Sequence, residues 1–383
     1  MKRTVFDADH EAFRRTIRDF LAAEVVPHYP AWLRDGTPRE LFRKLGKLGV
    51  TGFGIDEQFG GPGPVSYTYQ AIISEETTRV GVDFTHYMVS TGIVLPYLLN
   101  LADDEQARRW FPAIAAGDIV LSIAMTEPGT GSDLAGIRTT ARLSDDGSHY
   151  LLNGAKTFIT GARNAELTIV VARTCPAGDD RRAGLSLLAV ENASPGFTLG
   201  ARLHKIGQHA TDTSELSFTD VVVPAENLLG RAGEGFSYLG QNLPRERLAI
   251  GFHAAAAAAA AIDFAKSYVG SREIFGRSLS EFQNTKFVLA ECAAEVAAAQ
   301  ALADRGLELD EADELSVAEA ATVKLFCTEA AGRVIDKCLQ LHGGYGYVTE
   351  YPIARLYADT RVNRIYGGTS EVMKTIIAKD LDL

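Results

Sequence analysis

Apolar side chains in the first third of the chain recur every three or four residues, which is the spacing of one face of a helix. The pattern runs through segments near 13–21, 41–48, 72–73 and 110–117. Glycines and prolines between Phe59 and Pro64 interrupt it and predict a loop. We therefore predict an N-terminal domain of packed helices over residues 1–118.

The pattern changes at residue 119, where short strand-like apolar runs replace the helical spacing. Three such runs lie at 167–172, 185–190 and 216–223. Asp145–Asp146–Gly147 and Asn153–Gly154 are typical of tight hairpin turns. We predict a middle antiparallel β domain over residues 119–230.

Helical spacing returns after residue 230 in long segments rich in Ala, Leu and Glu. The run Ala254–Ala261, which is flanked by other apolar residues, predicts a tightly packed helix. Breaks are expected near Gly270, near Gly306 and in the loop 342–346. The sequence thus predicts a C-terminal bundle of the four-helix type over residues 231–383 and an α+β fold. No long linker appears, so the three parts are expected to pack as one body.

Composition and charge limit the function classes. The chain has 383 residues, of which 46% are hydrophobic and 23% charged, as in globular proteins of two or three domains. Its net charge of −11 opposes binding to nucleic acid. The four cysteines form no Cys-x-x-Cys pair, so we expect reduced thiols and no metal site. An apolar stretch of about 18 residues and a leader or transit peptide are both lacking, so we expect no membrane span and a cytoplasmic location.

Short motifs of several large enzyme classes are also lacking. The sequence has no Gly-x-x-x-x-Gly-Lys, His-Glu-x-x-His or Gly-x-Ser-x-Gly segment, and no Gly-x-Gly-x-x-Gly between a strand and a helix. These absences exclude phosphate-loop NTPases, Rossmann enzymes, zinc proteases of the His-Glu-x-x-His type and common hydrolases.

Two segments in the middle third can carry chemistry. Thr126–Asp133 forms a turn with two glycines, and such a turn can direct backbone N–H groups and hydroxyls at a phosphate or a polar ring. Spacing alone favours an ordinary surface turn. Lys156–Gly161 alternates an aromatic residue with hydroxyls, and by itself it indicates a strand whose Phe158 fills a core.

The C-terminal third adds further short motifs in a fixed order, namely Arg272–Gly276, Gln283, Gln340–Gly346 and Ile365–Glu371. Together with the two middle segments, they resemble the acyl-CoA dehydrogenase family over essentially all 383 residues. The resemblance implies a homotetramer, built as a dimer of dimers, in which each subunit holds FAD between the β domain and the C-terminal helices. It also implies an acyl-CoA substrate and an electron-transfer flavoprotein as the electron acceptor.

The resemblance further implies which residues contact the cofactor and the substrate. Phe158 is expected near the isoalloxazine ring and Thr160 near its N5 edge, while Arg272, Gln283 and the 340–344 loop are expected to reach FAD across the subunit interface. The full set of expected cofactor contacts is Met125, Thr126, Gly131, Ser132, Phe158, Ile159, Thr160, Arg272, Phe275, Gln283, Gln340, Gly343, Gly344, Thr369 and Glu371. The expected substrate contacts are Ser132, Arg247, Tyr366 and Gly367.

Family members remove a proton from the carbon next to the thioester carbonyl while a hydride leaves the adjacent carbon for flavin N5, which gives a trans-2-enoyl product. Because that proton is too weakly acidic for an unassisted carboxylate, a backbone N–H and a flavin hydroxyl hold the carbonyl oxygen. Many members carry the base as Glu directly after the Tyr of a Tyr-Glu-Gly-Thr motif, where this sequence has Gly367. Either the base comes from elsewhere, or the chain binds flavin without this chemistry.

A subgroup that includes the long-chain and isovaleryl-CoA dehydrogenases supplies the base from a helix. The segment Pro244–Leu248 is similar to the one in that subgroup, which makes Glu246 the expected catalytic base. A lone Glu between two Arg is ordinarily a solvated residue, but its presence together with a missing Glu at 367 favours the catalytic interpretation. Bound acyl-CoA is expected to raise the pKa of Glu246 by excluding water.

Other details of the site stay open. Arg247 either pairs with a CoA group or anchors the catalytic helix. The missing side chain at Gly367 is expected to leave volume for bulky acyl groups, and part of 87–92 is expected to line the acyl pocket. Rival functions are an acyl carrier protein substrate, an oxygen-using oxidase or monooxygenase, and a non-catalytic scaffold that binds flavin or acyl thioesters.

Overall fold

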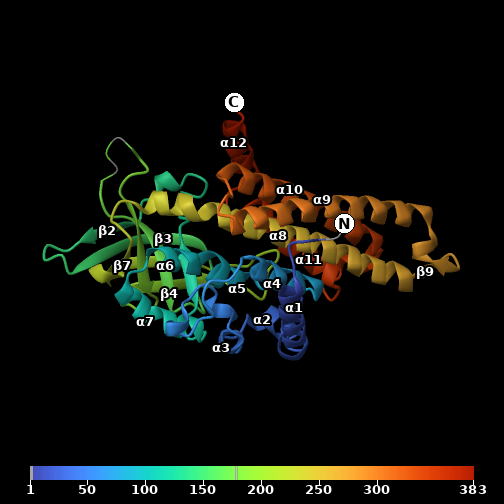
Figure 1. Cartoon of the computed structure of the whole chain (residues 1–383), viewed down its shortest axis with the longest axis horizontal. Helices are drawn as coiled ribbons and strands as arrows, with labels where there is room; N and C mark the ends of the chain where they lie inside the picture. Colours follow the sequence, from blue (N-terminus) through green and yellow to red (C-terminus); the bar gives the residue numbers. More distant parts are fainter. Residues whose placement is uncertain (1–2, 177, 179) are drawn as a thin grey trace.

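The computed structural model describes residues 3–176, 178 and 180–383 (Figure 1). The N-terminal part consists of short helices, α1 (Ala8–Phe20), η1 (Leu21–Val25), α2 (Tyr29–Asp35), α3 (Glu40–Lys47), α4 (Thr68–Arg79), α5 (Thr85–Tyr87), η4 (Met88–Val94), α6 (Leu95–Leu101) and α7 (Asp104–Ala115). Asp7 and Asp103 cap α1 and α7 by accepting backbone N–H groups of the first turn. The predicted helical pattern is therefore confirmed in this part of the chain.

The middle part is one sheet with the strand order β6-β7-β3-β2-β4-β5-β8, and β1 pairs with β4 beside this path. The strands are β1 (Leu121–Ala124), β2 (Thr140–Leu143), β3 (His149–Thr160), β4 (Leu167–Arg173), β5 (Leu185–Glu191), β6 (Phe197–Arg202), β7 (Thr213–Pro224) and β8 (Leu228–Leu229). Most neighbours are antiparallel, as predicted, but β1 runs parallel to β4, and β2 also pairs with β4 in parallel at Thr140 and Arg173. A parallel pair needs a long crossover, and the chain that forms β2 and β3 supplies it.

The two predicted hairpin turns have different outcomes. The chain reverses at Asp145–Gly147, between β2 and β3, as predicted. The turn predicted at Asn153–Gly154 is wrong, because β3 continues through these residues and a register shift against β7 marks a bulge there. Gly154 has φ of +148°, and the Asn153 side chain exchanges hydrogen bonds of 2.9 and 3.0 Å with Asp220 of β7. Asn153 and Gly154 therefore form part of a bulge in β3 and not a turn.

Three long helices, α8 (Gly235–Ser271), α9 (Gln283–Glu311) and α10 (Val317–Leu341), form the C-terminal bundle with η8 (Gly343–Tyr347), α11 (Pro352–Thr360) and α12 (Ser370–Asp380). Figure 1 shows the three long helices along the long axis and α12 projecting to one side of them. The small hairpin β9 (Glu273–Ile274) and β10 (Arg277–Ser278) lies at the opposite end from the sheet. Most of the alanine run is buried where α8 packs against α9 and α10. The predicted boundaries at 118 and 230 lie in the α7–β1 and β8–α8 connections.

The break predicted near Gly306 is wrong, because α9 continues through this residue. A Cβ atom at Gly306 would lie 2.7 Å from Cδ1 of Leu248 on α8. The glycine therefore permits close approach of two helices and does not end one. Among the described helices, α8 alone has the length and hydropathy of a membrane span, and 72% of its most apolar window is buried within the fold.

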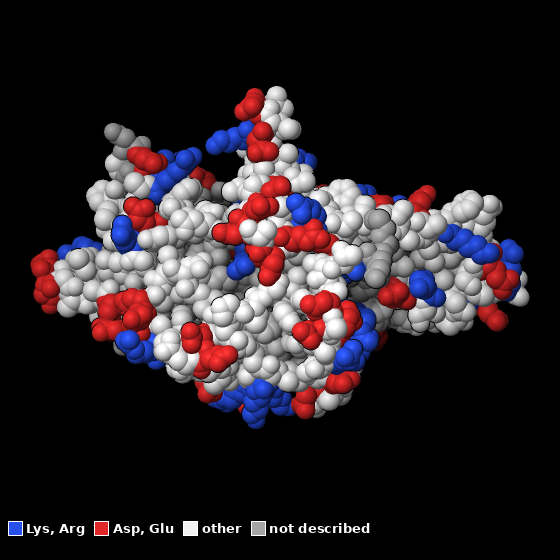
Figure 2. Space-filling model, viewed as in Figure 1, with Lys and Arg blue, Asp and Glu red and all other residues white. Residues whose placement is uncertain are grey.

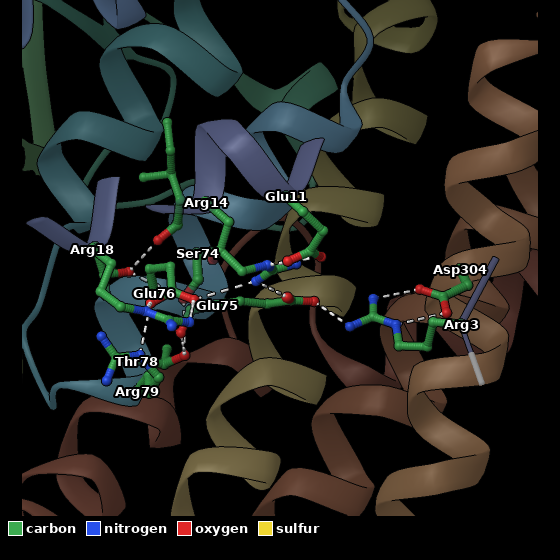
Figure 3. Close-up of polar contacts among 12 residues, drawn as sticks. Arg3, Glu11, Arg14, Arg18, Ser74, Glu75, Glu76, Thr78, Arg79 and Asp304 are labelled. Atoms are coloured by element: carbon green, nitrogen blue, oxygen red, sulfur yellow. Dashed lines mark hydrogen bonds and ion pairs between the residues drawn. The ribbon is translucent and has the colours of Figure 1, made fainter. Parts of the chain in front are cut away.

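A network of ion pairs ties the N-terminal helices to the bundle (Figure 3). Arg3 donates to Asp304 of α9, with Nε 2.8 Å from Oδ2, and also contacts Glu75 of α4. Arg14 of α1 lies 2.6 Å from the other oxygen of Glu75 and 3.4 Å from Glu76. The network thus joins three helices that are far apart in the sequence. On the face drawn in Figure 2, acidic and basic side chains are interspersed in small groups.

Candidate active site

Glu246 lies on α8 and its side chain is buried, with 6% of the residue exposed. The Tyr97 hydroxyl of α6 donates to Glu246 Oε1 at 2.7 Å. The Asn242 amide donates to the same oxygen at 3.3 Å and to the Ile93 carbonyl at 3.1 Å. Among the described residues, these hydrogen bonds of the Glu246 carboxylate all reach Oε1, which leaves Oε2 available to a ligand.

The surroundings of Glu246 favour its protonated form. Burial raises the pKa of Glu246 above its ordinary value, and the hydrogen bonds from Tyr97 and Asn242 and the charge of Arg247 offset this only in part. Burial and the adjacent carboxylate raise the pKa of Tyr97 well above its usual range, so Tyr97 remains a neutral donor. A carboxylate with a raised pKa is better matched to proton abstraction near neutral pH.

A glycine turn lies next to Arg247 and Ile250, which follow Glu246 on α8. Gly367 and Gly368 adopt φ of +64° and +94° just before α12. Arg247 Nε lies 3.5 Å from the Gly367 carbonyl oxygen, and Lys324 of α10 donates to the Gly368 carbonyl. The turn is therefore held by cationic side chains from two helices.

The expectation of free volume at Gly367 is wrong. A Cβ atom at this position would lie 2.5 Å from Cδ1 of Ile250, one turn after Glu246 on α8. Ile250 occupies the space that the first side-chain atom of a larger residue at 367 would need. The absence of that side chain does not enlarge the site.

Sequence reasoning missed Tyr97, Asn242, Ile250 and Lys324. Lys324 had a signal, because it occupies a core position in helical spacing with Ala320, Ala321 and Cys327. Tyr97 had none, since its contact with Glu246 joins positions 149 residues apart. In the segment 87–92, which was expected to line the acyl pocket, Tyr87 packs in the N-terminal core and donates to the Val50 carbonyl at 3.0 Å.

The structure brings together the two motifs of the middle domain. Lys156 Nζ donates to the Met125 carbonyl at 3.0 Å, and the Thr157 N–H donates to the Thr126 carbonyl at 2.9 Å. The Ser122 hydroxyl donates to the Thr160 carbonyl at 3.0 Å. The ends of β1 and β3 thus form one continuous edge.

This edge offers a surface that fits a planar ligand such as FAD. Phe158 is 65% exposed and has φ of +60°, a conformation that costs a bulky residue energy and is found mostly at functional sites. Gly131 and Ser132 are exposed on the neighbouring turn, and the space around Gly131 is open. Ile159 differs from the other expected contacts, because its side chain lies in the core of the sheet. An exposed aromatic beside an open glycine turn is consistent with the expected flavin contacts.

The other expected cofactor residues lie on the bundle. Phe275 is 93% exposed at the tip of the β9–β10 hairpin, with φ of +51°, and Arg272 and Gln283 flank that hairpin. His342 stacks on Tyr268 at 4.4 Å, which holds the loop with Gln340, Gly343 and Gly344 against the end of α8. Figure 1 shows this hairpin at the far end of the molecule from strand β3, which carries Phe158, so one chain does not bring the two groups together.

The remaining residues that were expected to contact cofactor or substrate lie at or just before the start of α12. Thr369 caps this helix by accepting the Val372 N–H, and Glu371 is exposed in its first turn. The Tyr366 hydroxyl donates to Asn363 at 2.6 Å. Tyr366 directly precedes the Gly367–Gly368 turn that contacts Arg247, and Thr369 directly follows it.

Three sequence models match the chain in order, the N-terminal domain of acyl-CoA dehydrogenase over residues 7–118, the middle domain over 122–221 and the C-terminal domain over 233–381. The chain belongs to the acyl-CoA dehydrogenase family. The mitochondrial long-chain specific acyl-CoA dehydrogenase of Sus scrofa is 42% identical over 380 residues, which cover 99% of this chain and 88% of that protein.

Solved structures of the family agree with this assignment. An acyl-CoA dehydrogenase from Geobacillus kaustophilus is 44% identical with a TM-score of 0.96, and the match covers 100% of both chains. An acyl-CoA dehydrogenase from Bacillus anthracis complexed with FAD is 30% identical with a TM-score of 0.91, covering 98% of this chain and 67% of that one. The predicted family, fold class, enzyme class and FAD cofactor are therefore confirmed.

Proposed function

We propose that the chain dehydrogenates an acyl-CoA thioester to the trans-2-enoyl-CoA, with Glu246 as the base. One observation carries the assignment of the base. The buried carboxylate of Glu246, whose neighbour Arg247 contacts the Gly367 turn, has one oxygen held by neutral donors, and no other described residue donates to its second oxygen. The pKa of this carboxylate is raised by burial, which suits it to accept a proton from carbon.

Glu246 Oε2 accepts the proton from the carbon next to the thioester carbonyl. Bound FAD would supply the acceptor for the hydride that leaves the adjacent carbon. The Gly367 N–H donates to the thioester carbonyl oxygen as negative charge develops on it, because the proton is otherwise too weakly acidic to leave. Substrate that covers Glu246 excludes the remaining water and raises the pKa of its carboxyl further.

The edge around Phe158, with Met125, Thr126, Gly131, Ser132 and Thr160, holds the flavin part of FAD in this proposal. Arg272, Phe275, Gln283 and the 340–344 loop hold the other half in a neighbouring subunit. Their exposure at the far end of the bundle supports a site that two copies of the chain complete, and hence the predicted homotetramer. Thr369, Glu371 and Tyr366 flank the same site. The electron-transfer flavoprotein partner and the cytoplasmic location stay predictions from the sequence.

The test is anaerobic addition of acyl-CoA thioesters to the FAD-loaded native enzyme and to E246Q. We expect the flavin absorbance of the native enzyme to bleach and that of E246Q to bleach at least about 100-fold more slowly, which is the contribution of a general base. E308Q, the same change at an exposed position of α9, should behave like the native enzyme. Normal bleaching of E246Q would remove Glu246 from the reaction.

Two further comparisons define the substrate carrier and the electron acceptor. Turnover on acyl-CoA should exceed turnover on the same acyl group carried by an acyl carrier protein. Enzyme reduced by substrate should reoxidise slowly in air, whereas rapid reoxidation would indicate an oxygen-using relative.

A further inference from the structure

Two buried cations lie beside the proposed site without a carboxylate in ion-pair contact. Lys324 is 1% exposed, and Arg247 is also buried. Within the described residues, neither side chain takes part in an ion pair of 4.0 Å or less. The charge of Glu246 acts on the pKa of Arg247, but the hydrogen bonds that the Glu246 carboxylate accepts come from Tyr97 and Asn242.

Lys156 shows how this fold treats an equally buried lysine elsewhere. Its ammonium group lies 2.9 Å from the Glu127 carboxylate, which is itself buried. Burial of an ammonium ion costs several kcal/mol unless a partner compensates for it. Within the described part of the chain, Lys324 has a backbone carbonyl as its sole acceptor, and buried charges that lack compensation in this way cluster at functional sites.

Both cations act on the same short turn. Arg247 Nε lies 3.5 Å from the Gly367 carbonyl oxygen, and Lys324 Nζ donates to the carbonyl of the next residue, Gly368. The position of a Cβ atom on Gly367 lies 3.7 Å from Lys324 Cε, so the lysine passes directly beside Gly367. Two consecutive carbonyl groups therefore point at positive charges from two different helices, which fixes a glycine turn that is otherwise free to change conformation.

We propose that Lys324 and Arg247 form a buried cation pair that holds the Gly367–Gly368 turn in place and stabilises negative charge on a carbonyl oxygen bound at the Gly367 N–H. This inference rests on the proposed function, which places the thioester carbonyl there. Lys324 is a positioning and electrostatic residue, because it reaches the substrate through the turn. Fixed charges in a site from which water is excluded act more strongly on a developing enolate than the same charges in water.

The cost of placing Lys324 here supports the proposal. Burial and the nearby Arg247 lower the pKa of Lys324 to about 8. At neutral pH and below, the side chain is still mainly charged, and its charge is available to the site.

The test follows the ionisation of bound acetoacetyl-CoA, whose acyl group forms an enolate with strong ultraviolet absorbance when it loses a proton. The FAD-loaded enzyme is saturated with this ligand and titrated between pH 5 and about 7.5, where Lys324 stays mainly charged. In the native enzyme, we expect the bound ligand to ionise more readily than it does free in solution. In K324M, the ionisation constant of the bound ligand should fall about tenfold, because one nearby cation is missing.

Matched variants separate charge from packing. K324R keeps the charge and should restore the ionisation constant to within about threefold of the native value. K337M makes the same change on the exposed side of α10, about 20 Å further along the helix, and should leave the constant unchanged. If K324M does not fold, R247M removes the other member of the pair and should shift the constant in the same direction.

The outcomes distinguish this inference from the proposed function. If the native enzyme binds acetoacetyl-CoA without promoting its ionisation, the carbonyl is not held at Gly367 and the proposed function fails. If the native enzyme promotes ionisation and the folded neutral variants do so equally well, the cation pair has no electrostatic role and only this inference fails.

Discussion

Two glutamates on different helices of this chain both have little exposed surface and have opposite electrostatic properties. Glu76 of α4 is 2% exposed, and it accepts hydrogen bonds from Arg18 at 2.9 and 3.0 Å and from Arg79 at 2.7 Å (Figure 3). Burial alone would raise the pKa of Glu76, but the two arginines lower it below the ordinary value. Glu246 has neutral donors, and its pKa is raised.

The comparison shows that burial does not define the role of a carboxylate. A glutamate surrounded by arginines has a stabilised charge, which makes it a good structural anchor and a poor proton acceptor. A glutamate held by a tyrosine and an asparagine has one fixed oxygen and an anion that is costly to bury. That second arrangement suits a base, because the carboxylate can accept a proton without losing an ion pair.

The largest expected effect on stability comes from replacing Glu76, the glutamate that accepts hydrogen bonds from arginines. E76Q leaves Arg14, Arg18 and Arg79 without their shared carboxylate, and we expect the free energy of unfolding to fall by about 2 kcal/mol. The loss is below that for a fully buried pair because Arg18 and Arg79 are partly exposed and can turn to water. Chemical denaturation of the FAD-loaded protein measures it.

Glu11 provides the control for this prediction. It also contacts Arg14 but is half exposed, so E11Q should change the free energy of unfolding by less than about 0.5 kcal/mol. Equal effects of E76Q and E11Q would mean that the network around Glu76 contributes no more than an ordinary surface ion pair.

A smaller effect is expected from removing the Tyr97 hydroxyl, which donates to Glu246. The Tyr97 hydroxyl stabilises the charged form of Glu246, so Y97F should raise the pKa of Glu246 and move the acid limb of the kcat/KM profile upward by about one pH unit. Activity should fall at pH values below the limb and recover above it. Steady-state kinetics across the pH range measure the shift.

Y67F is the matched control. Tyr67 is also buried near α8, but its hydroxyl donates to the uncharged Gly92 carbonyl at 2.8 Å. Y67F should therefore leave the acid limb in place even if it lowers stability. Identical limbs in Y97F and the native enzyme would show that Tyr97 does not set the protonation of the base.

The sequence predicted the fold well wherever local pattern and long-range packing agree. The helical spacing from Phe13 to Leu21 corresponds to helical segments whose apolar side chains pack in the N-terminal core, and the alanine run corresponds to the buried part of α8. The prediction failed where distant residues decide. Asn153–Gly154 has the residues of a tight turn, but pairing with β7 makes this segment a bulge. Gly306 was predicted to break a helix, but the close approach of Leu248 favours a glycine inside the helix.

The same division applies to the site. Glu246 was predicted as the base because its motif and the glycine at 367 are both visible along the chain, and Arg247 connects the helix of Glu246 to the Gly367 turn. The hydrogen bond from Tyr97 to Glu246 and the packing of Ile250 against Gly367 are contacts between elements that lie far apart in the sequence. Spacing within one helix cannot specify such contacts, and Lys324 is the exception because a charge on an apolar stripe is visible in the sequence itself.

The smallest expected effect concerns the stability of the enzyme without substrate. Because the pKa of Glu246 is raised in the folded state, its protonated form stabilises the fold at low pH, and this contribution is lost as the pH rises through the folded-state pKa. E246Q mimics the protonated form at every pH. We expect it to match the native protein in acid and to be more stable by less than about 1 kcal/mol at pH 8.

Glu76 should show the opposite trend in the same experiment. Its pKa is lowered, so its contribution is present at neutral pH and is lost as the pH falls through the folded-state value. Because the ordinary pKa of Glu is about 4.3, denaturation at pH 4 and pH 8 should therefore show E246Q gaining on the native protein, and E76Q falling further behind it, as the pH rises. If both variants move in the same direction, the two glutamates share one electrostatic environment and the choice of Glu246 as the base loses its physical ground.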